Sequence, residues 1–423
     1  MAAREATSPE DHWAELAELT NCAPGTLMGR LLRSFWQPVA AAVEVRSGKA
    51  MAVRIFSEDF TLYRGESGAP YLVAPRCAHR STRLDVGWVE DECIRCMYHG
   101  WKYDGSGQCV EMPAEDEGYP ARVKIASYPV QEYAGLIFAY LGGGEPPEFD
   151  LPRHPAMERT DGIRTINRNL WVGCNWFQSV ENSLDATHVS FVHRWGRLGS
   201  FGITVSDVMP KLEYEEIDWG IRQTATRSAN NVRVSDWTFP NRNHVVTAGL
   251  TPEDAWSQTF AWALAQDEEN ELRFGVQFSP VQGDAAKRYA EHLLANGYVP
   301  TGNPNEFYGR DAYDPGEHRD ELFLKRIVPE NASGLTNAQD YVAQAGQGVK
   351  VDRSQERLGR SDAGVLFLRR IFLRELTALR DGRPTKAWRR GGETIPMPLQ
   401  PWEHSNEELG WDRKGVTSTP GGS

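Results

Sequence analysis

The chain has 423 residues, enough for two domains with sizeable hydrophobic cores. Its 46 lysines and arginines against 58 aspartates and glutamates give a formal charge of −12, which argues against nucleic acid or an anionic membrane as the main partner. No apolar run approaches the length of a membrane span, and the first residues lack an apolar signal region, so we expect a cytoplasmic protein.

The distribution of apolar residues and of Gly and Pro predicts the domain organisation. Leu27, Leu31 and Leu32 recur at helical spacing and are followed by short alternating apolar runs separated by Gly and Asp turns. A stretch rich in Gly and Pro then marks a boundary. The predicted segments are an N-terminal helical segment at 1–35, an antiparallel β domain at 36–142, a linker at 143–150, a second domain at 151–400 and a polar tail at 401–423.

Two mixed pairs of metal-binding residues lie in the predicted β domain. The first pair is Cys77 and His79, and the second is Cys96 and His99. This spacing suits a [2Fe–2S] cluster in which thiolates bind one iron and imidazoles the other, because each short loop offers one ligand to each iron. Structural zinc also accepts two Cys and two His, but zinc sites usually pair like residues at looser spacing. The other four cysteines do not form a disulfide framework in a chain this long, and we expect them to be reduced.

The second domain contains a second candidate metal site around His188 and His193. On one continuous helix, Glu181, Asp185 and His188 would share a face, whereas His193 would point away from it. The helix must therefore end or bulge if both histidines bind one ion. Taken alone, this spacing is equally compatible with two histidines in the core or on the surface.

Together these motifs resemble the oxygenase (α) component of Rieske non-heme iron oxygenases. The resemblance rests on Cys-Ala-His-Arg at 77–80, on Tyr-His-Gly-Trp at 98–101, and on the Asn-x2-Asp-x2-His-x4-His pattern at 182–193. It implies an α+β chain, in which an all-β Rieske [2Fe–2S] domain precedes a helix-grip (START-like) catalytic domain with an antiparallel sheet and helices. Segments 23–39 and 352–362 are similar to the phthalate dioxygenase type, which implies homotrimers or stacked hexamers.

The resemblance also implies roles for individual residues. His188 and His193 match the imidazole ligands of a mononuclear Fe(II), and Asp185 matches a carboxylate that carries electrons from the Rieske cluster of a neighbouring subunit. Asp340 matches the third ligand, a carboxylate. Its neighbours Thr336 and Gln339 predict a capping box, which would place Asp340 in the first turn of a helix.

The resemblance implies a terminal oxygenase that uses O₂ and electrons from a separate NAD(P)H-dependent reductase, directly or through a ferredoxin. The expected substrate is an aromatic carboxylate, changed by ring hydroxylation or by O-demethylation of a methoxy-aromatic acid such as a lignin-derived compound. Ring cis-dihydroxylation of the phthalate, chlorobenzoate or phenoxybenzoate type is the alternative. An electron carrier and a zinc-stabilised binding protein are alternatives from other classes.

Arginine forks are the expected partners of a substrate carboxylate. Arg194 and Arg197 follow His193 directly, and Arg222 and Arg227 lie on a predicted strand that begins near position 221. Each of the four is otherwise explained as a solvated surface charge.

Overall fold

The computed structural model divides into two compact units, Cys22–Leu151 and the combination of Met1–Asn21 with Pro152–Ser423. The residues that it describes are 15–149, 151, 153–193, 209–228, 231–247, 249–251, 254–310 and 335–389. The predicted tail at 401–423, together with Arg194 and Arg197, lies outside the described residues. No helix in the described part of the chain is both long and apolar enough to cross a bilayer.

The unit Cys22–Leu151 is built from three small antiparallel sheets and the short helix α2 (Leu27–Arg33), which the leucine spacing predicts. The sheets have the orders β1-β11-β10, β2-β3-β4-β9 and β5-β6-β7-β8. Their strands are β1 (Trp36–Ala41), β2 (Lys49–Ile55), β3 (Glu58–Arg64), β4 (Pro70–Val73), β5 (Trp88–Glu90), β6 (Cys93–Arg95), β7 (Lys102–Tyr103), β8 (Cys109–Glu111), β9 (Ser127–Tyr128), β10 (Val130–Tyr133) and β11 (Leu136–Tyr140).

A nine-stranded sheet forms the centre of the other unit, in the order β13-β14-β15-β16-β17-β18-β12-β20-β19. Every pair of neighbouring strands is antiparallel except β12 with β20, which is parallel. The strands are β12 (Ile163–Trp171), β13 (Lys211–Ile217), β14 (Gly220–Ser228), β15 (Asn231–Thr238), β16 (Arg242–Thr247), β17 (Ser257–Ala265), β18 (Glu271–Ser279), β19 (Val299–Pro300) and β20 (Glu306–Arg310).

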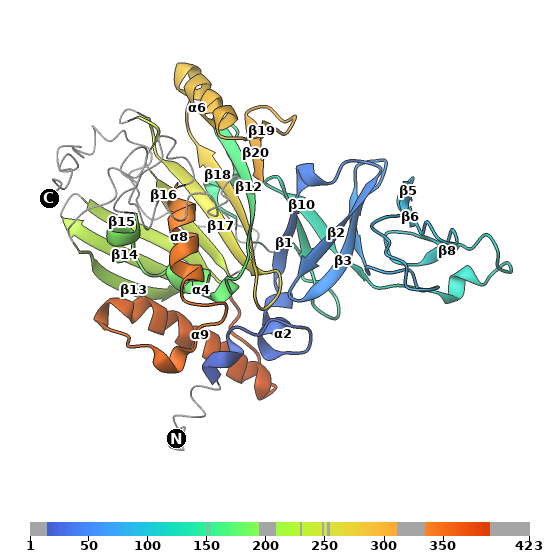
Figure 1. The fold of residues 1–423 in the computed structure, drawn as a ribbon, viewed down its shortest axis with the longest axis horizontal. Helices are drawn as coiled ribbons and strands as arrows, with labels where there is room; N and C mark the ends of the chain where they lie inside the picture. Colours follow the sequence, from blue (N-terminus) through green and yellow to red (C-terminus); the bar gives the residue numbers. More distant parts are fainter. Residues whose placement is uncertain are drawn as a thin grey trace. The chain divides into compact units, whose positions relative to one another are not determined.

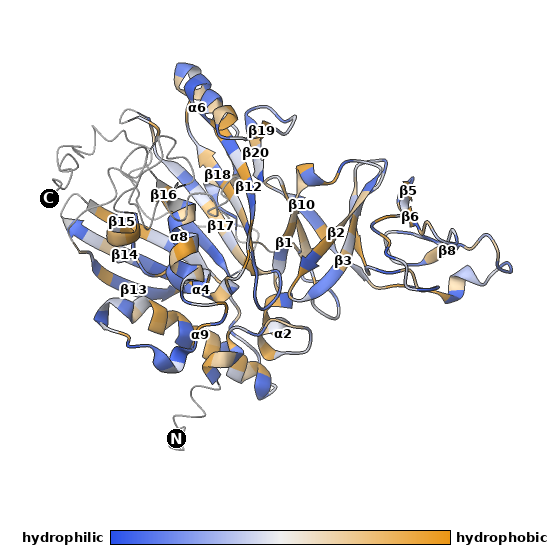
Figure 2. Cartoon of the chain, viewed as in Figure 1, coloured by the Kyte–Doolittle hydropathy of each residue, from blue (hydrophilic) through white to orange (hydrophobic). Residues whose placement is uncertain are grey.

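Helices accompany this sheet in the second unit (Figure 1). Their bounds are α3 (Pro155–Glu158), α4 (Trp176–Asn182), α5 (Val189–Val192), α6 (Gly283–Ala295), α8 (Leu335–Ala345) and α9 (Ala363–Arg380). Figure 2 shows that α9 carries both hydrophobic and hydrophilic residues. Phe372 of α9 packs against Phe177 of α4 and Trp237 of β15, with ring centroids 5.3 and 6.0 Å apart. Aromatic packing therefore holds α4 and α9 on one face of the sheet, which we call the site face.

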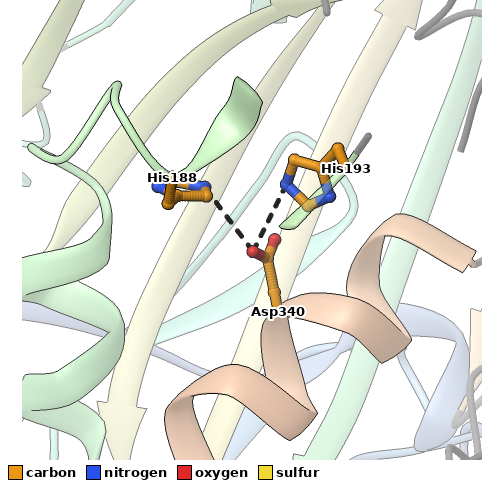
Figure 3. A group of neighbouring side chains, drawn as sticks. All are labelled: His188, His193 and Asp340. Carbon is orange, nitrogen blue, oxygen red and sulfur yellow. Dashed lines mark ion pairs between the residues drawn. The ribbon is translucent and has the colours of Figure 1, made fainter. Parts of the chain in front are cut away.

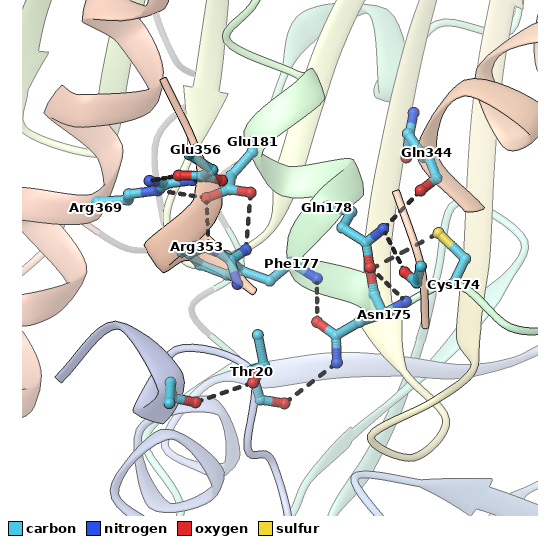
Figure 4. Close-up of polar contacts among 12 residues, drawn as sticks. Thr20, Cys174, Asn175, Phe177, Gln178, Glu181, Gln344, Arg353, Glu356 and Arg369 are labelled. Carbon is cyan, nitrogen blue, oxygen red and sulfur yellow. Dashed lines mark hydrogen bonds and ion pairs between the residues drawn. The ribbon is translucent and has the colours of Figure 1, made fainter. Parts of the chain in front are cut away.

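A buried group of opposite charges also ties α4 to the C-terminal segment (Figure 4). Glu181 of α4 accepts hydrogen bonds from Arg353, at 2.8 Å, and from Arg369 of α9, at 2.6 Å. Arg369 also donates to Glu356, so each buried charge has an oppositely charged partner. Glu181 is thus engaged in packing the helices and is not one of the residues that gather around the candidate metal site described below.

Candidate metal centres

The two Cys-His pairs of the N-terminal unit lie on two tight turns. The Ser81 amide donates to the carbonyl of Cys77, and the Gly100 amide donates to the carbonyl of Cys96. Gly100 has a φ of +75°, a backbone conformation that glycine adopts without steric cost. Both cysteines are buried in one hydrophobic cluster, and the imidazole rings of His79 and His99 lie 4.5 Å apart between centroids.

The donor atoms at these turns fit an iron–sulfur cluster. Nδ1 of His79 is buried and has no hydrogen-bond partner, although a buried imidazole nitrogen normally has one. Burial raises the pKa of the Cys77 thiol, so a thiolate here requires a cation such as iron beside it. Tyr103 lies 3.2 Å from Cys77 Sγ, and its oxygen accepts a hydrogen bond from the Ala78 amide. The hydroxyl proton of Tyr103 is therefore directed at the sulfur, a contact that the spacing of the motif did not predict.

The segment between α4 and α5 brings the second candidate site together. Helix α4 ends at Asn182, so Glu181, Asp185 and His188 do not share one helical face, and that prediction is wrong. The chain instead turns at Leu184, whose carbonyl accepts a hydrogen bond from the Tyr214 hydroxyl at 2.9 Å. His188 then caps the short helix α5, and His193 follows that helix directly.

His188, His193 and Asp340 converge from three separate positions in the chain (Figure 3). One potential ligand atom from each residue lies within 4.8 Å of the others. Oδ1 of Asp340 is 3.6 Å from His188 Nε2 and 3.4 Å from His193 Nε2. Two imidazoles and one carboxylate are the donor set of non-heme iron sites that leave positions open for O₂ and substrate.

The second nitrogen of each imidazole is held by a neighbouring oxygen. Nδ1 of His193 lies 3.1 Å from Oε1 of Gln339, and Nδ1 of His188 contacts the carbonyl oxygen of Asp185. An amide oxygen and a backbone carbonyl can only accept, so each Nδ1 carries the proton. Both Nε2 lone pairs therefore face Asp340, and a cation between them and the carboxylate would be bound by all three residues.

The electrostatics of this group also favour a cation. Burial by itself would raise the pKa of Asp340, but His193 and His188 outweigh burial and lower it. Burial would lower the pKa of His193, but Asp340 outweighs burial and raises it. Oδ1 of Asp340 is buried without a hydrogen-bond partner. A carboxylate oxygen of this kind, facing two imidazole lone pairs, fits a mononuclear iron.

The position of Asp340 in helix α8 differs from the prediction. The helix begins at Leu335, before Thr336, so Asp340 lies in its second turn. Gln339 does not complete a capping box, because its side chain contacts His193 across the site. The predicted capping box is therefore wrong, although the segment does place Asp340 beside the two histidines.

The side chain of Asp185 accepts hydrogen bonds from backbone amides and does not bond to the His188 ring. Its Oδ1 accepts from the amides of Thr187, at 2.9 Å, and His188, at 3.3 Å, whereas its Oδ2 is 3.9 Å from His188 Nδ1. The Asp185 side chain is 29% exposed, and within the described part of the chain Oδ2 accepts no hydrogen bond. The partly exposed side chain of Asp185 therefore keeps one carboxylate oxygen that the described residues do not occupy.

The two arginines of β14 that were predicted to bind substrate have different partners and lie on different faces of the sheet. Arg222 forms a two-pronged ion pair with Asp236, at 2.8 Å for both contacts, on the face of the sheet opposite to Arg227. This ion pair already accounts for the charge of Arg222. Arg227 lies on the site face, where among the described residues its hydrogen bond is a 3.3 Å contact to the carbonyl of Ala186.

Arg233, which the sequence did not single out, faces the same side from β15. Its register position is opposite Ala225, two residues from Arg227, and its charge opposes the rise in the pKa of His193. Burial, with Arg227 nearby, lowers the pKa of Arg233 to about 10, so its guanidinium group is charged at neutral pH, and burial also lowers the pKa of Arg227. No carboxylate of the described residues pairs with either arginine, and the Nε of each is buried without a partner.

Comparison with known proteins identifies the family. A Rieske [2Fe-2S] domain matches residues 35–133. The chain is 31% identical over 396 residues to the 5,5'-dehydrodivanillate O-demethylase oxygenase subunit of Sphingobium sp., covering 90% of this chain and 85% of that protein. It is also 31% identical over 392 residues to the phenoxybenzoate dioxygenase subunit alpha of Ectopseudomonas oleovorans, covering 86% and 85%.

The chain belongs to the Rieske non-heme iron aromatic oxygenases, as an oxygenase component. Its cofactors are a Rieske [2Fe–2S] cluster and a mononuclear iron, with O₂ as co-substrate. The predictions of family, α+β fold class, enzyme class and cofactors are confirmed. Among solved structures, Pseudomonas putida CBB5 NdmA with caffeine has the same fold, with a TM-score of 0.62 and 17% identity over 87% of this chain and 98% of that chain.

Proposed function

We propose that Cys77, His79, Cys96 and His99 bind the Rieske cluster, and that His188, His193 and Asp340 bind the mononuclear iron. The observation that carries the second assignment is the convergence of three ligand atoms within 4.8 Å, around a buried carboxylate oxygen that has no other partner. The iron supplies activation of O₂ when bound. Gln339 and the Asp185 carbonyl hold the Nδ1 protons, which orients both imidazoles and fixes the tautomer that leaves Nε2 to bind the iron.

We infer that the substrate is an aromatic carboxylate and that Arg227 and Arg233 bind its carboxylate. Two charged guanidinium groups without an acidic partner are costly in a half-buried position, and a substrate carboxylate would neutralise them. The relatives are named for acting on dehydrodivanillate and phenoxybenzoate, but also for tert-butanol, which has no carboxylate. The unpaired arginines favour the acids over the alcohol.

Electrons would come from a separate reductase, and the last transfer would pass between two copies of this chain. The support is the partly exposed side chain of Asp185, whose Oδ2 accepts no hydrogen bond within the described part of the chain. A ring nitrogen of the Rieske histidine from a neighbouring copy is a suitable donor for this oxygen. A head-to-tail homotrimer, alone or stacked as a hexamer, would supply that donor to every chain.

The test is a single turnover with the iron-loaded, reduced protein. An anaerobic sample is given one pulse of O₂ with one member of a panel of aromatic acids, and the products are identified by mass. Formaldehyde and a lost methyl group would identify O-demethylation, which we expect for a methoxy-aromatic acid, whereas added oxygen would identify ring hydroxylation. If the cluster reoxidises at the same rate with and without every acid, the aromatic carboxylate is the wrong substrate class.

A further inference from the structure

Partly exposed residues lie near the middle of the site face, on β17 and β12. On β17, Phe260 and Trp262 are buried, whereas their neighbours Thr259 and Ala261 are partly exposed. On β12, Asn167 is likewise partly exposed next to the buried Ile166. Strand neighbours point to opposite faces, so the accessible residues share one face.

Register and ring packing show that this face is the one beneath the candidate iron site. Trp171 lies four residues after Asn167 on β12, and therefore on the same face. Its ring packs against Tyr341 of α8, the residue after Asp340, with centroids 5.5 Å apart. The partly exposed residues therefore lie on the same face of the sheet as helix α8.

Asn167 stands between two glycines in this area. It is level with Gly275 on β18 and with Gly309 on β20. A Cβ on Gly309 would lie 2.8 Å from the Tyr298 ring, so that position is covered. Gly275 is buried, but among the described residues a Cβ on it would meet nothing closer than Asn167 Cβ at 3.6 Å, so these residues leave room above Gly275.

In the side-chain amide of Asn167 the oxygen accepts a hydrogen bond, whereas the nitrogen has no acceptor among the described residues. The Tyr298 hydroxyl donates to Asn167 Oδ1 at 2.6 Å, which fixes the orientation of the amide. In the described part of the chain Asn167 Nδ2 donates to no acceptor, and it lies 3.7 Å from the Cβ position of Gly275. The free donor is therefore next to the room above that glycine.

We propose that Asn167, oriented by Tyr298, determines specificity by donating a hydrogen bond to an oxygen substituent of the substrate. This inference rests on the proposed function, in which Arg227 and Arg233 bind the carboxylate. Strands β16, β17 and β18 separate β15 from β12, so Arg233 and Asn167 are four strand spacings apart, about 19 Å along the sheet. The oxygen must lie at the end of the substrate far from the carboxylate, which selects acids with two linked rings over single-ring acids.

The test compares two acids that differ by one hydroxyl group, biphenyl carboxylate and its distal para-hydroxy derivative. Their dissociation constants are measured by calorimetry with the anaerobic, iron-loaded protein. The wild type should bind the hydroxylated acid about three- to tenfold more tightly, the effect of one hydrogen bond. Asn167→Ala should remove this preference, while its binding of the unsubstituted acid serves as the control for an intact site.

Two further variants separate hydrogen bonding from loss of packing. Asn167→Leu keeps the volume of the side chain but has neither donor nor acceptor for the substrate hydroxyl, so it should also lose the preference. Tyr298→Phe should reduce the preference, because the amide is no longer held. Equal binding of both acids by the wild type, or an unchanged preference in Asn167→Ala, would overturn the inference. Failure of the wild type to bind either acid would instead count against the proposed substrate class.

Discussion

The hydrogen bond between Gln339 and His193 gives a quantitative prediction about the iron site. In Gln339→Leu the buried Nδ1–H of His193 loses its acceptor Oε1 of Gln339, at 3.1 Å. Leaving such a donor unsatisfied costs about 1–3 kcal/mol, and about 1.4 kcal/mol corresponds to a tenfold change in an equilibrium constant. We therefore expect the affinity for Fe(II) to fall about ten- to hundredfold, the range found when partners of metal-bound histidines are removed.

The measurement is an anaerobic Fe(II) titration in competition with a chelator. Gln339→Glu is the matched control, because a carboxylate still accepts the Nδ1 proton, and its Fe(II) affinity should equal or exceed that of the wild type. The electron paramagnetic resonance signal of the reduced cluster should be the same in all three proteins, which shows that the N-terminal unit is intact. Wild-type affinity in Gln339→Leu would refute the inferred role of this hydrogen bond.

Three other predictions concern electron transfer, substrate binding and acid stability. Asp185→Asn should keep both metals but abolish turnover, measured as product formed per O₂ pulse; a wild-type rate would remove Asp185 from the electron path. Arg233→Met should weaken binding of an aromatic acid about ten- to hundredfold, the loss of a charge-assisted hydrogen bond, but should leave binding of the matching aldehyde unchanged. Burial lowers the pKa of His154 to about 2 and that of His244 to about 3, with the Arg242 charge adding to the effect in both. Between pH 6.5 and pH 5 these two histidines are protonated in the unfolded chain but not in the folded one. Each should therefore lower the free energy of unfolding by about 2 kcal/mol at pH 5. His154→Asn, which keeps a side chain able to cap α3, should make urea unfolding less sensitive to pH between 7 and 5; an unchanged pH dependence would contradict this reasoning.

Local spacing in the sequence was sufficient to propose the ligands of the cluster. Cys77 with His79, and Cys96 with His99, lie on turns so short that the backbone itself brings the two side chains together. The same reasoning failed for Glu181, Asp185 and His188, because it assumed a continuous helix. The end of α4 depends on distant partners, Tyr214 at the Leu184 carbonyl and two arginines at Glu181, which periodicity along one helix does not reveal.

Two residues near His193 were not predicted in their observed positions. Gln339 of α8 was predicted to cap its own helix but contacts His193, and Arg233 of β15 was not singled out. Nothing in the local sequence of Arg233 distinguishes it from a solvated arginine. The nine-stranded sheet could be predicted as alternating strands, but its order could not, because β12 joins the sheet between β18 and β20. Residue-level function at this site is therefore a consequence of strand order and register.

The most direct test of the central claim is the iron content of Asp340→Ala beside that of the wild type, with both proteins loaded anaerobically. The account predicts that the variant loses one iron per chain and all turnover, while the colour and the resonance signal of the cluster remain unchanged. An Asp340→Ala protein that keeps its full iron content and its activity would contradict the assignment of His188, His193 and Asp340 as the mononuclear iron site.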